Sequence, residues 1–166
     1  AELKKELLES GIRVSVDASS ETSMGWKLND AELTGIPVAL IVGKRELESG
    51  NLTASVRFTK IKQEISIQNL SSNVTELLEQ IQKEMFEKAK QKTKDLTFSA
   101  ENYDEFKTIM QKNRGFIRAL WCEDSDCEKA IKEETKATTR CLPFTDKKGT
   151  VEEKSGKCVK CGGEAK

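Results

Sequence analysis

The 166-residue sequence contains no histidine, and this absence limits the chemistry that the chain can perform by itself. Serine–histidine–aspartate and cysteine–histidine nucleophiles both need an imidazole, as does a catalytic metal site with histidine ligands. Any general acid or base would have to be a carboxylate, a lysine, a tyrosine or a cysteine. A self-contained hydrolase is therefore not expected.

The sequence also lacks an excess of charge of one sign and a long apolar segment. Lysine and arginine together number 28, as do aspartate and glutamate, so the formal net charge is zero and nucleic acid could bind only through a local patch. No apolar run approaches the roughly 20 residues that a membrane span needs. Neither DNA nor a membrane is expected as a partner.

The first half of the chain mixes helical and strand patterns, which indicates a layered α/β domain. Helices are predicted at residues 1–9 and 26–33, followed by Gly11 and Gly35. Four strands are predicted from alternating or continuous apolar residues, at 12–16, 36–42, 52–57 and 61–67. The second strand is almost wholly apolar, as in a strand covered on both faces, and a turn at 44–48 follows it.

A longer helix opens the second half. Apolar residues repeat at helical spacing over residues 74–92, and Asn73 with Glu76 is predicted as an N-terminal capping pair. Further helices are predicted around 106–110 and at 125–136, strands at 116–121 and 138–144, and a mobile loop at 145–157. Cys141 lies in the last strand and is predicted to be a small buried side chain.

Four of the five cysteines form two closely spaced pairs. Four residues separate Cys122 from Cys127, and two residues separate Cys158 from Cys161. Both spacings let one short loop place two sulfurs at adjacent corners of a tetrahedron, and soft thiolates suit zinc. Because a site made only of cysteines has no open position for water, we expect a structural zinc that fastens the loop at 145–157.

Three other uses of these cysteines are open. Disulfide bonds need an oxidising compartment, and five cysteines leave one over. An iron–sulfur cluster takes the same four thiolates. The pair at 158 and 161 could be redox-active, although it lacks the βα context that activates such motifs.

The residues around the cysteines indicate a protein family more specifically than the spacing of the cysteines does. Residues 121–135, 140–144 and 158–162 closely resemble the C-terminal zinc-binding domain of prolyl-tRNA synthetases of the archaeal and eukaryotic type. Residues 11–14, 25–29, 32–37 and 42–48 resemble the anticodon-binding domain of the same family. The resemblance implies an α/β fold: a mixed-sheet anticodon-binding domain at residues 1–73, without its first strand, then a smaller α/β zinc-binding domain at residues 74–166, packed on it.

The resemblance also implies a function for the intact protein. That protein would be a class II proline–tRNA ligase whose upstream catalytic domain, absent here, binds ATP and magnesium and forms a cytoplasmic homodimer. The chain has no initiator methionine and its first helix has no preceding cap, so we expect a fragment that binds the tRNA for proline without performing the chemistry. The alternative is a noncatalytic scaffold or protein-interaction module derived from that family.

By motif position, the resemblance assigns RNA contacts to Glu32, Arg45 and Glu46. Proline anticodons share two guanines, and the exposed Watson–Crick edge of guanine presents two N–H donors and one carbonyl acceptor. A carboxylate accepts from the donors, and lysine or arginine donates to the oxygen. Without the family, such charged residues at helix ends and turns would simply be solvated.

Several neighbouring positions bear on this assignment. Ala39 replaces an arginine that commonly contacts a base in this family, and Phe58 replaces another arginine. Loss of a bidentate donor removes ~1–3 kcal/mol of base discrimination, so we expect anticodon reading to be weakened or redistributed. Lys27 either contacts a backbone phosphate or covers its helix, and Trp26 is expected in the core rather than stacked on a base.

Overall fold

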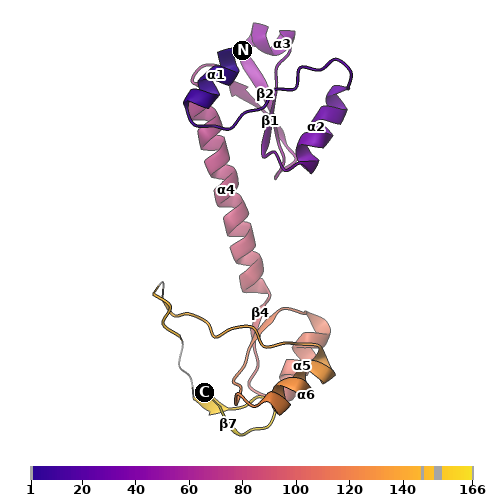
Figure 1. Cartoon of the computed structure of the whole chain (residues 1–166), viewed down its shortest axis with the longest axis vertical. Helices are drawn as coiled ribbons and strands as arrows, with labels where there is room; N and C mark the ends of the chain where they lie inside the picture. Colours follow the sequence, from indigo (N-terminus) through magenta and orange to yellow (C-terminus); the bar gives the residue numbers. More distant parts are fainter. Residues whose placement is uncertain (1, 147, 152–154, 166) are drawn as a thin grey trace. The chain divides into compact units, whose positions relative to one another are not determined.

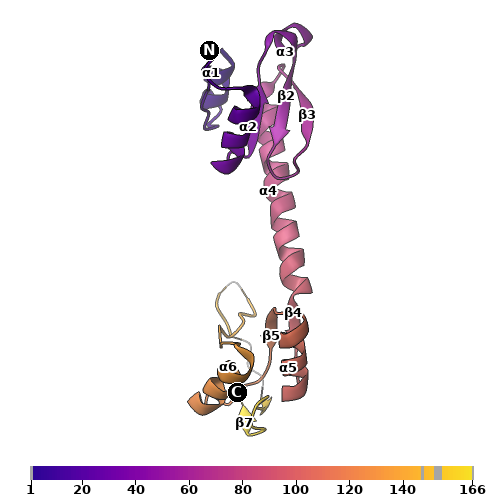
Figure 2. The same ribbon diagram turned by 90° about the vertical axis from the view of Figure 1, so that its right-hand side faces the viewer.

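The computed structural model describes residues 2–146, 148–151 and 155–165 of the chain, and Figures 1 and 2 show its elements. The chain forms two compact units: the first unit comprises residues 1–89 and the second unit residues 90–166. Each unit combines helices with a small sheet and has its own apolar core, which confirms the predicted α/β fold. None of the described helices has the length and apolar character of a membrane span.

The first unit contains one antiparallel sheet with helices packed on it. Its elements are α1 (Glu2–Glu9), α2 (Met24–Leu33), β1 (Val38–Ile41), α3 (Lys44–Ser49), β2 (Asn51–Val56), β3 (Lys62–Ser66) and α4 (Leu70–Asp95). The strands lie in the order β1-β2-β3, and every pairing is antiparallel; a parallel partner, which a mixed sheet requires, is not among the described residues of this unit.

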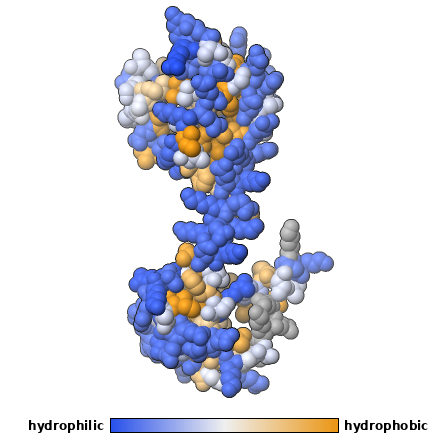
Figure 3. All heavy atoms as spheres, turned by 180° about the vertical axis from the view of Figure 1, so that it is seen from behind, coloured by the Kyte–Doolittle hydropathy of each residue, from blue (hydrophilic) through white to orange (hydrophobic). Residues whose placement is uncertain are grey.

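The core of the first unit lies between the sheet and the two helices α1 and α4. Burial alternates along the central strand β2, as expected for a strand with one face on a core. The nine buried core residues are Leu7, Leu52, Ala54, Val56, Ile65, Leu70, Val74, Leu77 and Ile81. In α4 the buried positions repeat at helical spacing, whereas residues 85–95 are all exposed and mostly hydrophilic (Figure 3).

Three predictions for the first unit are wrong. Residues 12–16 form no strand, because no described strand pairs with them, although Ile12 and Val14 still pack against the core. The apolar run at 36–42 gives only β1, an edge strand whose residues are half-buried rather than covered on both faces. The turn predicted at 44–48 is the helix α3.

The long helix α4 begins earlier than its apolar pattern indicated. It starts at Leu70, so Asn73 lies inside the helix and is not its cap. The Asn73 side-chain amide instead donates to the backbone oxygens of Ser66 at 3.1 Å and Gln68 at 3.0 Å, and thereby ties the helix to the end of β3. The domain boundary predicted at residue 73 falls within α4 and stays a prediction.

The described part of the second unit contains two small sheets and the helices α5 and α6, which follow the end of α4. Its elements are β4 (Thr97–Ser99), α5 (Tyr103–Lys112), β5 (Phe116–Arg118), α6 (Ser125–Thr135), β6 (Gly156–Lys157) and β7 (Glu164–Ala165). Strands β4 and β5 are parallel, and β6 and β7 are antiparallel. The core is small and consists of the buried residues Ala100, Phe106, Ile131 and Val159.

The segment after α6 differs from the prediction. Residues 138–144 form no strand; the described part of this segment makes one isolated bridge, between Phe144 and Val151. Cys141 is exposed rather than buried, because the strand that would have covered it does not form. Part of the loop predicted at 145–157 lies outside the described residues, namely Lys147 and residues 152–154.

Candidate metal centre and RNA-binding residues

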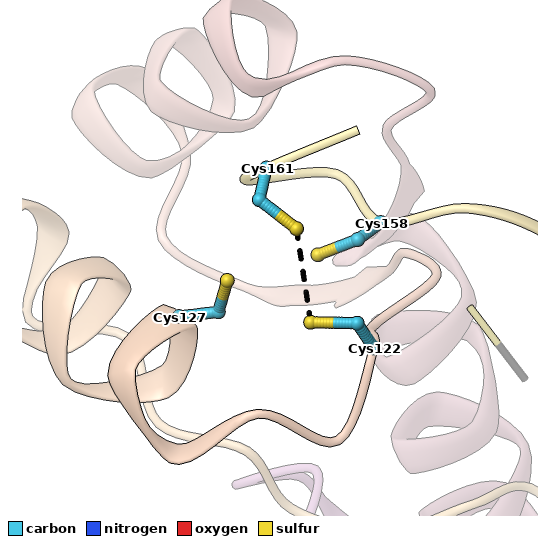
Figure 4. A group of neighbouring side chains, drawn as sticks. All are labelled: Cys122, Cys127, Cys158 and Cys161. Atoms are coloured by element: carbon cyan, nitrogen blue, oxygen red, sulfur yellow. Dashed lines mark hydrogen bonds between the residues drawn. The ribbon is translucent and has the colours of Figure 1, made fainter. Parts of the chain in front are cut away.

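The four paired cysteines lie together in the second unit. The Sγ atoms of Cys122, Cys127, Cys158 and Cys161 are all within 4.8 Å of one another, and Figure 4 shows the four side chains pointing toward a common centre. The Sγ atoms of Cys122 and Cys161 are 3.8 Å apart. Tetrahedral Zn–S bonds of ~2.3 Å place neighbouring sulfurs about 3.8 Å apart. The cluster therefore has the size and the donor set to hold a metal ion such as zinc.

The first cysteine pair is positioned by the turn that leads into α6. The Asp124 side chain caps this helix, because its Oδ1 accepts a hydrogen bond of 2.7 Å from the N–H of Asp126. The backbone oxygen of Asp124 accepts a second hydrogen bond, of 3.3 Å, from Nε1 of Trp121. These contacts hold Cys122 just before the turn and Cys127 in the first turn of the helix.

The second cysteine pair lies in a tight turn between β6 and β7. The N–H of Cys158 donates to the oxygen of Gly163 at 2.8 Å, and the N–H of Gly162 donates back to the oxygen of Cys158 at 2.9 Å. The turn needs φ of +71° at Gly162, a conformation that glycine adopts at no steric cost. The N–H of Gly163 also donates a hydrogen bond of 3.4 Å to Sγ of Cys161.

The surroundings of the thiols favour charge to different degrees. Burial, followed by hydrogen bonding with Cys161 and Cys122, raises the pKa of Cys127 to about 12. Burial also opposes charge on Cys158, but backbone N–H groups, first that of Cys161 and then that of Lys160, outweigh it and lower the pKa of Cys158 to about 6. One thiolate is thus favoured at neutral pH without a metal, and a divalent cation would stabilise the others.

All five cysteines are described, and all are free thiols. Cys141 is exposed and is not a member of the cluster. A bound metal ion would use the four clustered thiols together, whereas a disulfide would use only two of them.

Among the predicted RNA contacts, Glu32 lies at the end of α2 beside the turn between β2 and β3. Its carboxylate accepts a hydrogen bond from Nζ of Lys60, and its backbone oxygen accepts one of 2.7 Å from Nε of Arg57. The side chains of Glu32 and Lys60 are 37% and 62% exposed, so both can reach a ligand. A hydrogen-bond acceptor and a cationic donor therefore lie side by side on the surface.

Lys60 and Arg57 were not predicted as site residues. The signal that could have identified them is the concentration of basic residues, Arg57, Lys60 and Lys62, around the turn after β2. Their hydrogen bonds to Glu32 join residues that are 28 positions apart for Lys60 and 25 for Arg57, which no local pattern reveals.

Arg45 and Glu46 lie together in the first turn of α3, directly after β1. Arg45 is exposed, whereas Glu46 is half-buried. A Cβ added to Gly43 would lie 2.7 Å from a carboxylate oxygen of Glu46, so the Glu46 side chain folds back over this glycine. Glu32 precedes the start of β1, whereas Arg45 and Glu46 follow its end. The four residues of this strand span roughly 10 Å. The structure therefore places the predicted contacts in two groups, one at each end of β1.

The two family positions that have lost an arginine lie in different environments. Ala39 pairs with Ser55 in the sheet, on the face opposite to Val38 and Leu40, which pack against the core. Phe58 is half-buried against the same core, and Nζ of Lys88 lies 5.2 Å from the centroid of its ring. The aromatic ring thus has a packing role in the first unit.

Lys27 and Trp26 also have defined environments in α2. Nζ of Lys27 donates to the backbone oxygen of Ser19 at 2.5 Å and lies 3.0 Å from Oδ1 of Asp17, so this side chain fastens the loop before the helix. Trp26 is 55% exposed in the described structure, which contradicts its predicted core role.

Comparisons with known proteins agree with both halves of the chain. A family model described as an anticodon binding domain matches residues 1–77, and a model described as the C-terminal domain of prolyl-tRNA synthetase matches residues 103–166. The chain is 41% identical over 165 residues to a proline–tRNA ligase of Lachnospira eligens, with 99% of the chain and 33% of the relative covered. It is 38% identical over 160 residues to proline–tRNA ligase 2 of Clostridioides difficile, with 96% of the chain and 32% of the relative covered.

The fold agrees with a solved structure as well. The crystal structure of prolyl-tRNA synthetase from Cryptosporidium parvum, complexed with L-proline and AMP, matches with a TM-score of 0.83 and 32% identity. The match covers 99% of this chain and 34% of that protein. The chain thus spans about a third of the length of its relatives. It belongs to the prolyl-tRNA synthetase family, of which it contains the anticodon-binding domain and the C-terminal domain.

Proposed function

We propose that this chain is the tRNA-recognising part of a proline–tRNA ligase, an enzyme that attaches proline to its tRNA with the use of ATP. Support comes from the two family matches and from relatives that are proline–tRNA ligases. In this proposal residues 1–73 bind the anticodon and residues 74–166 form the metal-binding domain. ATP and magnesium bind to a catalytic domain outside the chain, through which the enzyme forms a homodimer in the cytoplasm, where tRNAs are charged.

The observation that carries the proposal is the exposed pair of Glu32 and Lys60. The Watson–Crick edge of guanine needs an acceptor for its two N–H donors and a donor for its carbonyl oxygen. Glu32 supplies the acceptor and Lys60 the donor. When RNA binds, each side chain exchanges its hydrogen bond with the other for a hydrogen bond with the guanine base. Lys60 thereby takes over the donor function that Ala39 cannot provide.

The second group of predicted contacts fits the second guanine. Arg45 and Glu46 combine a donor and an acceptor on one helical turn, at the far end of β1 from Glu32. On the sheet face between the two groups, Ala39 and its partner Ser55 are small and leave room for an anticodon nucleotide, and Ile41 with its partner Thr53 follows toward Arg45. In this proposal each acid–base pair therefore reads one guanine of the anticodon.

The four clustered cysteines hold a structural zinc in this proposal. The fit of the donor set and of the 3.8 Å sulfur separation supports it. When bound, zinc would stabilise the thiolates and connect two segments that are far apart in sequence. Cys122 and Cys127 come from the start of α6, and Cys158 and Cys161 come from the turn after β6. With four thiolates the ion has no open position for a substrate, so its contribution is stability.

The test is binding of the chain to an RNA stem–loop with the proline anticodon, compared with the same stem–loop in which adenine replaces both guanines. Glu32→Ala and Lys60→Ala are expected to reduce the preference for guanine at least about fivefold, because lost base-edge contacts cost ~1–3 kcal/mol. Lys5→Ala is the control: this exposed lysine lies on α1, whose Leu7 packs into the core on the other face of the sheet, and its loss should leave the guanine preference unchanged. An unchanged guanine preference in both the Glu32 and the Lys60 variant would contradict the role of this pair, whereas no preference in the wild type would favour the alternative of a scaffold that does not read tRNA.

A further inference from the structure

Lys160 lies between two of the proposed zinc ligands in the sequence, and its side chain contacts the helices α5 and α6. It follows Val159 in the turn that carries Cys158 and Cys161. Its Nζ lies 2.5 Å from Oε1 of Glu134, near the end of α6. The Lys160 side chain is only 21% exposed, so this ion pair is more shielded from solvent than the Lys107–Asp104 and Lys129–Asp126 pairs.

The same ammonium group contacts an aromatic ring on α5. Nζ of Lys160 lies 4.0 Å from the centroid of the Tyr103 ring, within the range of a cation–π interaction. The Tyr103 ring stacks on Phe106, a member of the core, with centroids 6.0 Å apart. Its hydroxyl is buried without a hydrogen-bond partner in the described part of the chain. Burial, together with the nearby Glu134 carboxylate, raises the pKa of Tyr103. Lys160 is thus held by both helices of the second unit.

The neighbouring residue of the same turn is fixed by a second set of contacts. Val159 is 7% exposed within the core, and its N–H donates to the oxygen of Leu120 at 2.9 Å. Leu120 lies two positions before Cys122, so this hydrogen bond sets the turn beside the segment that carries the first ligand pair. Both residues between Cys158 and Cys161 therefore anchor the turn without any contribution from a metal.

We infer that Lys160 is a positioning residue of the metal centre, which holds the turn with Cys158 and Cys161 in the metal-binding arrangement through Glu134 and Tyr103. This inference rests on the proposal that the four cysteines hold zinc. The ion pair and the ring contact reduce the freedom of the turn before the ion binds, so less conformational entropy is lost on binding. The exposed Cys161, which follows Lys160 directly, gains most from this restraint.

Equilibrium competition for zinc between the whole chain and a chromogenic chelator tests the inference. Lys160→Met keeps most of the side-chain length but removes the charge, and it is expected to weaken zinc binding about tenfold, which is within the 10–100-fold effect of outer-shell residues. Glu134→Gln is expected to weaken it in the same direction, and the double variant by less than the product of the two effects, because both remove one interaction. Lys160→Arg keeps the charge and the ring contact and is expected to restore most of the affinity.

Lys129→Met is the matched control, because Lys129 forms an ion pair with Asp126 on α6 but its side chain is 70% exposed. It is expected to leave the zinc affinity unchanged. A second readout is the rise in Tm that zinc produces: a positioning role reduces this rise, whereas a merely structural role lowers the Tm with and without zinc equally. If the Lys160→Met and Glu134→Gln variants bind zinc with wild-type affinity, the role of Lys160 is overturned but the proposed zinc site stands. If the wild type does not take up zinc, both are overturned.

Discussion

Removal of zinc is expected to destabilise the second unit and to leave the first unit folded. Among the described residues, the core cluster of the first unit has nine buried members, whereas that of the second has four, one of which, Val159, lies between two of the proposed zinc ligands. Zinc at 1,000 times its dissociation constant contributes about 4 kcal/mol to stability. Since 1 kcal/mol shifts the Tm of a domain of 60–100 residues by about 4–8 °C, chelation should lower the Tm of the second unit by roughly 15–30 °C.

The two tryptophans of the chain allow each unit to be followed separately. The Trp26→Phe variant keeps Trp121, which precedes Cys122 and donates a hydrogen bond to the backbone oxygen of Asp124, in the turn between Cys122 and Cys127. The Trp121→Phe variant keeps Trp26, which lies in α2 of the first unit. Thermal unfolding of both variants is measured by fluorescence with and without a chelator.

The expected result is a lower transition temperature for the Trp121 signal and an unchanged transition for the Trp26 signal. Cys158→Ser in the Trp26→Phe background should reproduce the effect of chelation without a chelator, because it removes one of the four proposed zinc ligands. A Trp121 transition that neither chelation nor Cys158→Ser lowers would refute the idea that a metal stabilises this unit.

Two further predictions concern packing and ionisation. Gly115→Ala should lower the Tm of the second unit, because its Cβ would lie 2.2 Å from the backbone oxygen of Leu96, and such overpacking typically costs about 1–3 kcal/mol or more. Gly25→Ala in α2, where the nearest neighbouring atom would be 4.0 Å away, should instead raise stability by about 0.5–1 kcal/mol. Equal effects of the two substitutions in thermal melting would contradict this prediction. The Lys160 ammonium holds the pKa of Glu134 below its ordinary value of 4.5, so the stability that Glu134 contributes is present above pH 4.5 and is lost as the pH falls through the lowered value. The difference in free energy of unfolding between wild type and Glu134→Gln, measured with urea, should therefore shrink below pH 4.5, and a difference that is constant down to pH 2 would contradict the ion pair.

Local patterns predicted the elements that depend on local interactions. The predicted helices at 26–33 and 125–136 correspond to α2 and α6, and the structure shows that Ser23 and Asp124 cap their N-termini. The four cysteines were predicted to cluster because each pair is set by a short loop. Strand formation at 12–16 was predicted wrongly, because the alternation of Ile12 and Val14 indicates which side faces the core but not whether a neighbouring strand is present.

Contacts between distant segments could not be read from sequence. The pairing of Glu32 with Lys60 depends on the turn between β2 and β3, and that of Lys160 with Glu134 depends on how the cysteine turn meets α6. Cys141 was predicted to be buried from its apolar neighbours alone, but those neighbours form no strand and leave it exposed. In each case tertiary contacts decide the environment of a side chain whose local sequence is uninformative.

The central claim is that this chain recognises the proline anticodon by its guanines. The most direct measurement is the affinity of the chain for the tRNA for proline, compared with the same tRNA carrying inosine at both anticodon guanine positions, at near-physiological salt. Inosine keeps the carbonyl oxygen and N1–H but lacks the amino group, so it removes one donor to each carboxylate and leaves the phosphates unchanged. We predict at least about fivefold weaker binding to the inosine-containing tRNA, from the ~1–3 kcal/mol of a base-edge contact. Equal binding to both tRNAs, or no binding to either, would contradict the claim.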